Sequence, residues 1–141
     1  MSRVFWDTML LIYLLEGNPG FRPRADALLA RSRKRGDSLF TSCLAVGEVM
    51  AGVERFENPL KAAAVRETLE EIGFRFLPFD AGAISTFSFL RSREKLRVAD
   101  AVHLSSAASV GIDLFLTGDT QLFKLDVPGI QFIADFNSPI L

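Results

Sequence analysis

Four acidic residues are the strongest candidates for chemistry in this sequence: Asp7, Glu48, Asp100 and Asp119. Carboxylates brought into one cleft repel one another, so their charge is costly unless a cation compensates it. Oxygen ligands with few His or Cys side chains nearby suit a hard cation such as Mg²⁺ or Mn²⁺ rather than zinc. A cation held in this way lowers the pKa of a bound water and stabilises the leaving oxygen of a phosphodiester. The acids therefore predict a metal site suited to phosphodiester hydrolysis.

The elements expected around these acids bring them to one edge of a sheet. Short apolar runs alternate with longer amphipathic segments, which is typical of βαβ units around a parallel sheet. Asp7 directly follows an expected strand over Arg3–Trp6, and Asp119 lies just beyond an expected strand over Leu114–Leu116. The other two acids lie near the beginnings of helices, which in such units meet the carboxyl ends of the strands. One cleft can therefore collect all four acids.

The remaining elements are predicted from apolar spacing and from capping and turn residues. The expected helices cover Met9–Glu16, about Pro23–Lys34, a segment capped by Ser42 that carries Ala45, Val46, Val49 and Met50, a segment after Asn58-Pro59, a segment from Asp80 through Leu90, and Val98–Val110 before Gly111. Further strands are expected at Ser38–Thr41, Arg75–Phe79 and Ile130–Ile133. The turn Gly17-Asn18-Pro19-Gly20 is expected to end the first helix.

The composition fits one domain over residues 1–141, because 49% hydrophobic residues supply one core. A formal net charge of −1 means that a nucleic-acid partner must be held by a local basic patch. The single cysteine, Cys43, excludes an internal disulfide and is expected to be a small buried side chain. The charge of Asp7 inside the first apolar stretch argues against a signal peptide, and no apolar run is long enough to span a bilayer. We therefore expect a cytoplasmic protein.

The acids lie in specific local strings: a hydrophobic strand followed by Asp7-Thr8, Gly47-Glu48 within residues 41–49, Ala99-Asp100-Ala101-Val102-His103-Leu104, and Phe115-Leu116-Thr117-Gly118-Asp119. Their ordered set closely resembles the PIN-domain family, from Val4 to about Ile133. The spacing is similar to that of the VapC toxins of bacterial and archaeal toxin–antitoxin pairs. The strings are more specific together than any one of them is alone.

This resemblance implies a three-layer α/β/α fold with a central, mainly parallel sheet. It also implies a Mg²⁺-dependent endoribonuclease that hydrolyses RNA, together with a cognate antitoxin protein. The catalytic and metal-binding roles of the family map onto Asp7, Glu48, Asp100 and Asp119. In the family the residue two before the last acid is often Ser or Thr, which Thr117 matches, and this side chain orients a carboxylate or a metal-bound water.

Other polar residues near the acids have a functional and a structural interpretation. Thr8 either polarises the first turn of its helix or caps it. His103 lies one helical turn after Asp100 and can face the cleft, although a lone histidine among apolar neighbours favours the structural interpretation. Asp80 is expected to cap a helix, and Asp113 belongs at the opposite edge of the sheet. Asp26, Asp37, Asp126 and Asp135 have no motif and are left outside the site.

Two basic strings are the candidate sources of positive potential for an RNA backbone: Arg31, Arg33, Lys34 and Arg35, and Arg91, Arg93, Lys95 and Arg97. Solvated helix faces are the alternative interpretation, and Arg97 is the best single candidate for a phosphate contact. Most of the 13 phenylalanines are expected in the core. The others are expected to form a homodimer contact or the groove for an antitoxin segment.

Three other functions compete with the metal-dependent ribonuclease. A PIN fold without catalysis can serve as an RNA- or protein-binding module, although the presence of all four acids argues against it. A phosphatase of the haloacid dehalogenase type needs a second aspartate two residues after the first, where this chain has Met9. A DNA nuclease related to flap enzymes shares the metal chemistry, but this short chain lacks extra segments to grip a branched duplex.

Overall fold

The computed structural model describes the whole chain except residues 17–18, 57–58 and 139–140. Within the described residues, five strands form one parallel sheet in the order β3-β2-β1-β4-β5. The strands are β1 Arg3–Trp6, β2 Ser38–Ser42, β3 Arg75–Leu77, β4 Ile112–Thr117 and β5 Ile130–Asp135. The helices are α1 Thr8–Glu16, α2 Arg22–Arg35, α3 Cys43–Phe56, α4 Pro59–Ile72, α5 Ile84–Ser92 and α6 Val98–Val110, with a 3-10 turn η1 at Ala81–Ala83.

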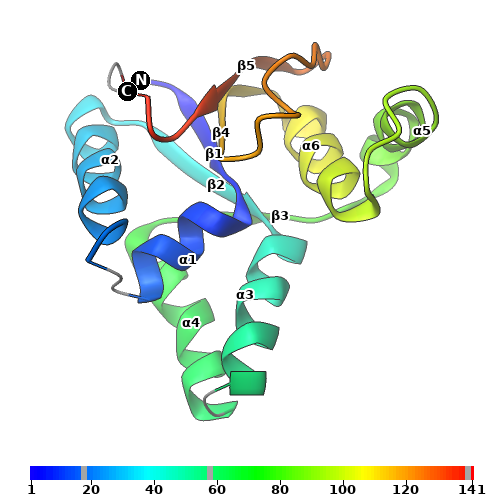
Figure 1. Cartoon of the computed structure of the whole chain (residues 1–141). Coiled ribbons are helices and arrows are strands. Elements are labelled where there is room, and N and C mark those ends of the chain that lie inside the picture. The colour runs from blue at the N-terminus through cyan, green and yellow to red at the C-terminus, as the bar shows by residue number, and fades with distance from the viewer. Residues whose placement is uncertain (17–18, 57–58, 139–140) are drawn as a thin grey trace.

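Helices cover both faces of this sheet, which confirms the expected three-layer α/β/α fold. Figure 1 shows α1 to α4 on one side of the strands and α5 and α6 on the other. Successive residues of β1 point to opposite faces, so Val4 and Trp6 pack with α1 to α4, whereas Phe5 packs with α5 and α6. Both faces are buried, which explains why the strands are nearly continuous apolar runs.

Local chemistry explains where the strands and helices differ from expectation. The strand expected over Arg75–Phe79 ends at Leu77, because Pro78 has no N–H to continue the ladder. The first helix begins at Thr8, one residue early, since the Asp7 carbonyl accepts from the N–H groups of Leu10 at 3.1 Å and Leu11 at 3.4 Å. β4 and β5 both extend beyond the ranges expected for them. Gly17, Asn18 and Asn58 of the expected turns lie outside the described residues.

The topology determines where a site can form. Strands β1 and β4 are neighbours at the centre of the sheet, although more than 100 residues separate them. Their carboxyl ends, followed by Asp7 and Gly118, therefore lie side by side, and α3 and α6 begin at the same edge. None of the described helices is long and apolar enough to cross a membrane.

Candidate active site

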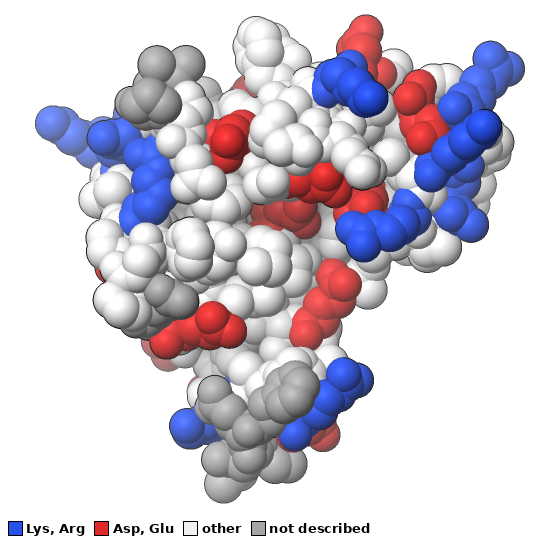
Figure 2. Space-filling model, viewed as in Figure 1, with Lys and Arg blue, Asp and Glu red and all other residues white. Residues whose placement is uncertain are grey.

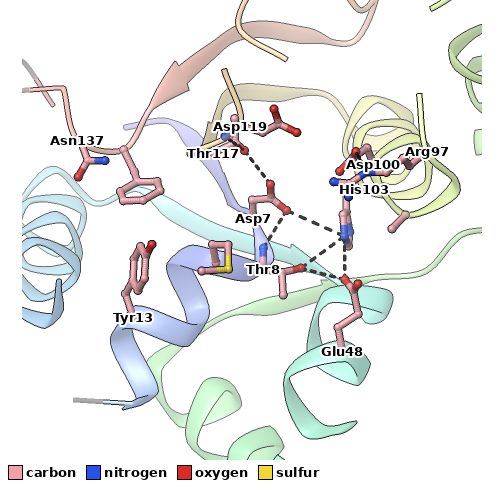
Figure 3. A pocket seen from close by; sticks show the side chains of 14 residues that line it. Asp7, Thr8, Tyr13, Glu48, Arg97, Asp100, His103, Thr117, Asp119 and Asn137 are labelled. Atoms are coloured by element: carbon pink, nitrogen blue, oxygen red, sulfur yellow. Dashed lines mark hydrogen bonds and ion pairs between the residues drawn. The ribbon is translucent and has the colours of Figure 1, made fainter. Parts of the chain in front are cut away.

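A pocket of about 450 Å³ opens at this carboxyl edge of the sheet. All five residues that the sequence predicted for the site line it: Asp7, Glu48, Asp100, Thr117 and Asp119. The side chains converge from β1, α3, α6 and the end of β4, as Figure 3 shows. The structure thus brings together residues that span most of the sequence.

Asp7 is largely buried, with 15% of its side chain exposed. The Thr8 N–H donates to its Oδ1 at 2.8 Å, and the Thr117 hydroxyl donates to its Oδ2 at 2.7 Å. Burial raises the pKa of the Asp7 carboxyl above its ordinary value, and the nearby Asp100 raises it further. Charge on His103 and the hydrogen bonds from Thr117 and Thr8 act in the opposite direction. Ionised Asp7 is therefore costly here without a compensating cation.

Thr117 connects Asp7 with Asp119. Its fully buried hydroxyl donates to Asp7 and accepts from the Asp119 N–H at 3.1 Å, so its donor and acceptor functions are both used. Asp119 in turn accepts at Oδ1 from the Gln121 N–H at 3.0 Å, which orients its carboxylate. These contacts fix the Asp7 carboxylate and the Asp119 backbone relative to each other.

Asp100 and Arg97 form an ion pair at the rim of the pocket. Arg97 Nε donates to Asp100 Oδ2 at 3.1 Å, and the side chains are 80% and 13% exposed, respectively. The hydrogen bond from this guanidinium to Asp100 is the main cause that raises the pKa of Arg97. Most of the guanidinium faces solvent, so it remains accessible to an anionic ligand.

Glu48 enters the pocket from the second turn of α3. Its Oε1 accepts from the Thr8 hydroxyl at 3.0 Å and lies 3.0 Å from His103 Nε2. His103 is 3% exposed, which agrees with the structural interpretation, yet it also lines the pocket. The sequence did not place Thr8 or His103 among the main site residues. A position next to an acid, or one helical turn from it, does not show what the side chain contacts.

The donor chemistry of the pocket fits a hard divalent cation bound partly through water. Its acids are carboxylates, the ligands that Mg²⁺ and Mn²⁺ prefer. Within the described residues, no three His, Cys, Asp or Glu side chains are grouped closely enough to hold a metal ion directly. Mg²⁺ keeps several waters and binds proteins through one or two carboxylates, so the spacing of these acids suits it better than zinc.

The remaining acids lie where expected, outside the pocket lining. Asp80 caps η1, because its Oδ1 accepts from the Gly82 N–H at 3.0 Å. Asp113 accepts from the Arg3 N–H at 2.8 Å at the opposite edge of the sheet. The expectation for Cys43 was wrong: it is exposed, because it is the first residue of α3 and its side chain does not face the core.

Only one of the two basic strings approaches the pocket. Arg97 lines it, and Lys95 lines an adjoining pocket of about 340 Å³ that shares Arg97, Asp100 and Asp119 with the first. In Figure 2, acidic side chains gather around the central hollow and basic side chains border it on the right. The string at Arg33–Arg35 ends α2, which leads into the beginning of β2, so it lies at the opposite edge of the sheet.

Comparison with solved structures shows the same fold in VapBC complexes. VapBC2 from Rickettsia felis, bound to a promoter DNA fragment, matches with a TM-score of 0.76 and 13% identity over 94% of this chain and 98% of that chain. DNA-bound VapBC from Salmonella typhimurium matches with a TM-score of 0.74 and 21% identity over 96% and 99%. VapC20 from Mycobacterium tuberculosis, a sarcin-ricin loop cleaving toxin, matches with a TM-score of 0.63 and 17% identity over 79% and 86%.

Comparison with curated proteins gave no match. The family model of the PIN domain matches residues 4–128, which is nearly the whole chain, and this range contains every acid that lines the pocket. The parallel sheet, the acidic pocket at its carboxyl edge and the family match agree, and the chain belongs to the PIN-domain family.

Proposed function

We propose that this protein is a Mg²⁺-dependent endoribonuclease that hydrolyses RNA phosphodiester bonds, with Mn²⁺ as an alternative metal. The observation that carries the proposal is the convergence of Asp7, Glu48, Asp100 and Asp119 on one pocket. Four carboxylates in one place serve stability poorly, because they repel one another and two of them, Asp7 and Asp100, are largely buried. They are well suited as ligands for a cation that contacts a phosphate of the substrate.

The residues of the chain divide the work of such a reaction. Arg97 offers an exposed guanidinium at the rim, where it binds a phosphate of the RNA backbone. Thr117 holds Asp7 and the Asp119 backbone in fixed positions, so these ligands need little reorganisation. A bound metal supplies charge neutralisation at the phosphate and activation of a water.

Two observations support RNA as the proposed substrate: the activity of a toxin with a similar fold, and the shape of the site. The toxin with a similar fold, VapC20, is described as cleaving the sarcin-ricin loop. The adjoining pocket, lined by Lys95 and Gln121, provides space and polar groups for a nucleotide next to the one being cleaved. Single-stranded loops present splayed nucleotides that such shallow pockets can hold.

We also propose that the enzyme is the toxin of a toxin–antitoxin pair and acts as a homodimer. Similar folds occur in VapBC complexes, which supports a cognate antitoxin. Exposed apolar side chains such as Phe21, Phe79 and Phe132 are available for protein contacts. The pairing is tested by finding a small DNA-binding partner in the adjacent reading frame and co-purifying it with this protein. Light scattering of the purified protein tests the homodimer.

The decisive experiment compares matched acid variants. Purified wild type, Asp119→Asn and Asp80→Asn are incubated with a panel of structured RNAs in Mg²⁺, Mn²⁺ or EDTA under single-turnover conditions. We expect Asp119→Asn to lose cleavage by orders of magnitude, because it removes a pocket carboxylate with little change of shape. Asp80→Asn should cleave like wild type, since Asp80 lies outside the pocket lining.

Three results would contradict the proposed function. Cleavage that persists in excess EDTA, or at the wild-type rate in a well-folded Asp119→Asn protein, would exclude the metal mechanism. RNA binding without cleavage in either metal would identify the non-catalytic binding module instead.

A further inference from the structure

His103 is the single histidine of the sequence, and its two ring nitrogens contact two different elements. Nδ1 lies 2.7 Å from the Ser42 hydroxyl at the end of β2, and Nε2 lies 3.0 Å from Glu48 Oε1 on α3. Figure 3 shows the ring between α6 and the Glu48 carboxylate. The ring therefore bridges a fully buried serine and a carboxylate of the pocket.

When the ring is neutral, its partners determine which of the two nitrogens carries the proton. An ionised carboxylate only accepts hydrogen bonds, so Nε2 must carry a proton and donate to Glu48. Nδ1 of the neutral ring is then an acceptor, and the Ser42 hydroxyl must donate to it. The Ser42 oxygen keeps a lone pair for the Ala45 N–H, which donates to it at 2.9 Å. Every donor in this chain of hydrogen bonds has an acceptor.

This chain of hydrogen bonds ends at Glu48, the most flexible acidic side chain of the pocket. Glu48 is long and 39% exposed, so it has more rotamer freedom than the shorter acids of the pocket. The Thr8 hydroxyl and His103 Nε2 both donate to its Oε1, at 3.0 Å each. Two donors from different elements hold the carboxylate in one orientation.

We propose that Ser42 and His103 are positioning residues: a directed chain of hydrogen bonds from Ser42 holds His103 as its Nε2–H tautomer and thereby holds Glu48 in place for a divalent cation. This inference rests on the metal site of the proposed function. Removal of a residue that hydrogen-bonds to a metal ligand and orients it typically weakens metal affinity 10- to 100-fold. The orientation of Glu48 comes from α1 and α6, the latter supported by β2, and not from its own helix.

The tautomer can be measured directly, because a single histidine gives an unambiguous signal. Long-range ¹H–¹⁵N spectra of the untagged, metal-free wild type in mildly alkaline solution should show a protonated Nε2 and an unprotonated Nδ1. A protonated Nδ1, or rapid averaging between the two tautomers, would overturn the proposed chain. This measurement needs neither a variant nor catalytic activity.

Matched serine variants test the effect on the cation. Ser42→Ala removes the donor to His103, whereas Ser105→Ala removes an equally buried hydroxyl that donates to the Ala101 carbonyl within α6. Calorimetric titration with Mg²⁺ or Mn²⁺ alone should give about tenfold weaker binding for Ser42→Ala and unchanged binding for Ser105→Ala. Ser42→Thr keeps a hydroxyl that can both donate to His103 and cap α3, and it should restore most of the affinity.

The outcomes distinguish this inference from the proposed function. If Ser42→Ala is folded and binds Mg²⁺ like wild type, the positioning role is wrong, whatever the nuclease assays show. If the tautomer and the affinities behave as expected but no RNA is cleaved, the nuclease proposal fails and the positioning role stands.

Discussion

At the scale of single residues, Asp7 gives the clearest dependence on pH. Its carboxyl has a folded pKa above the ordinary value of 3.8, mainly because of burial. The folded state therefore binds more protons than the unfolded state, and stability falls as the pH rises from 3.8 through the folded pKa. We expect metal-free Asp7→Asn to melt at a higher temperature than wild type near neutral pH, with the gain disappearing below the ordinary pKa. Melting curves in EDTA across this range test it, and a lower melting temperature at every pH contradicts it.

Thr117 is expected to affect both stability and the site. Thr117→Val keeps the shape but leaves the Asp119 N–H and one Asp7 oxygen without their buried partner. Each unsatisfied buried group costs about 1–3 kcal/mol, so urea unfolding should show a loss of at least that size. Thr117→Ser keeps the hydroxyl and is the control. A Thr117→Val protein as stable as wild type, or a larger loss for Thr117→Ser than for Thr117→Val, would contradict this role of the hydrogen bonds.

At the scale of elements, the two basic strings should behave differently toward RNA. Arg97 lies at the rim of the pocket beside α6, whereas Arg33 lies in the last turn of α2 at the opposite edge. Arg97→Gln should weaken RNA binding and reduce the logarithmic salt slope by about 0.7, the value for one phosphate contact on a single strand. Arg33→Gln should change neither quantity. Fluorescence anisotropy at several salt concentrations measures both, and an equal effect of the two variants would place RNA elsewhere.

The entry into β5 depends on a glycine. Gly129 has a φ of +99°, and a Cβ there would collide with the backbone carbonyl of Ala108 at the end of α6. Gly36 has a φ of +73° but open space around it. Gly36→Ala should therefore cost only the conformational strain of about 1–2 kcal/mol, and Gly129→Ala should cost clearly more. Urea denaturation measures the free energy of unfolding of both variants. Similar losses would mean that the loop before β5 accommodates the added Cβ at little cost.

At the scale of the whole molecule, metal binding should stabilise the fold. A ligand at 100 times its Kd adds about 2.7 kcal/mol to the free energy of unfolding. We therefore expect saturating Mg²⁺ to raise the Tm of wild type and of Asp80→Asn, and to raise that of Asp119→Asn much less. Thermal melts in saturating Mg²⁺ and in EDTA measure these Tm values. A rise of the same size in all three proteins would place the stabilising cation outside the pocket.

The sequence by itself determined the fold class and the positions of the acids. Alternating apolar and amphipathic segments predict a parallel sheet, and in such a sheet strand ends and helix beginnings share one edge. Asp7 and Asp119 could therefore be placed together although more than 100 residues separate them. Local rules also predicted the caps at Ser42 and Asp80, because capping depends on residues two or three positions away.

Only the tertiary structure decided which side chains meet across elements. Ser42 was predicted as a cap, but its contact with His103 joins residues 61 positions apart and depends on how α6 packs against β2. The contact between His103 and Glu48 likewise joins residues 55 positions apart, on α6 and α3. A sequence pattern gives the period and direction of each element, whereas contacts between elements depend on the rotation and spacing of their packing. The acidic site could be predicted from the chain, and the hydrogen bonds by which Ser42 and His103 orient Glu48 could not.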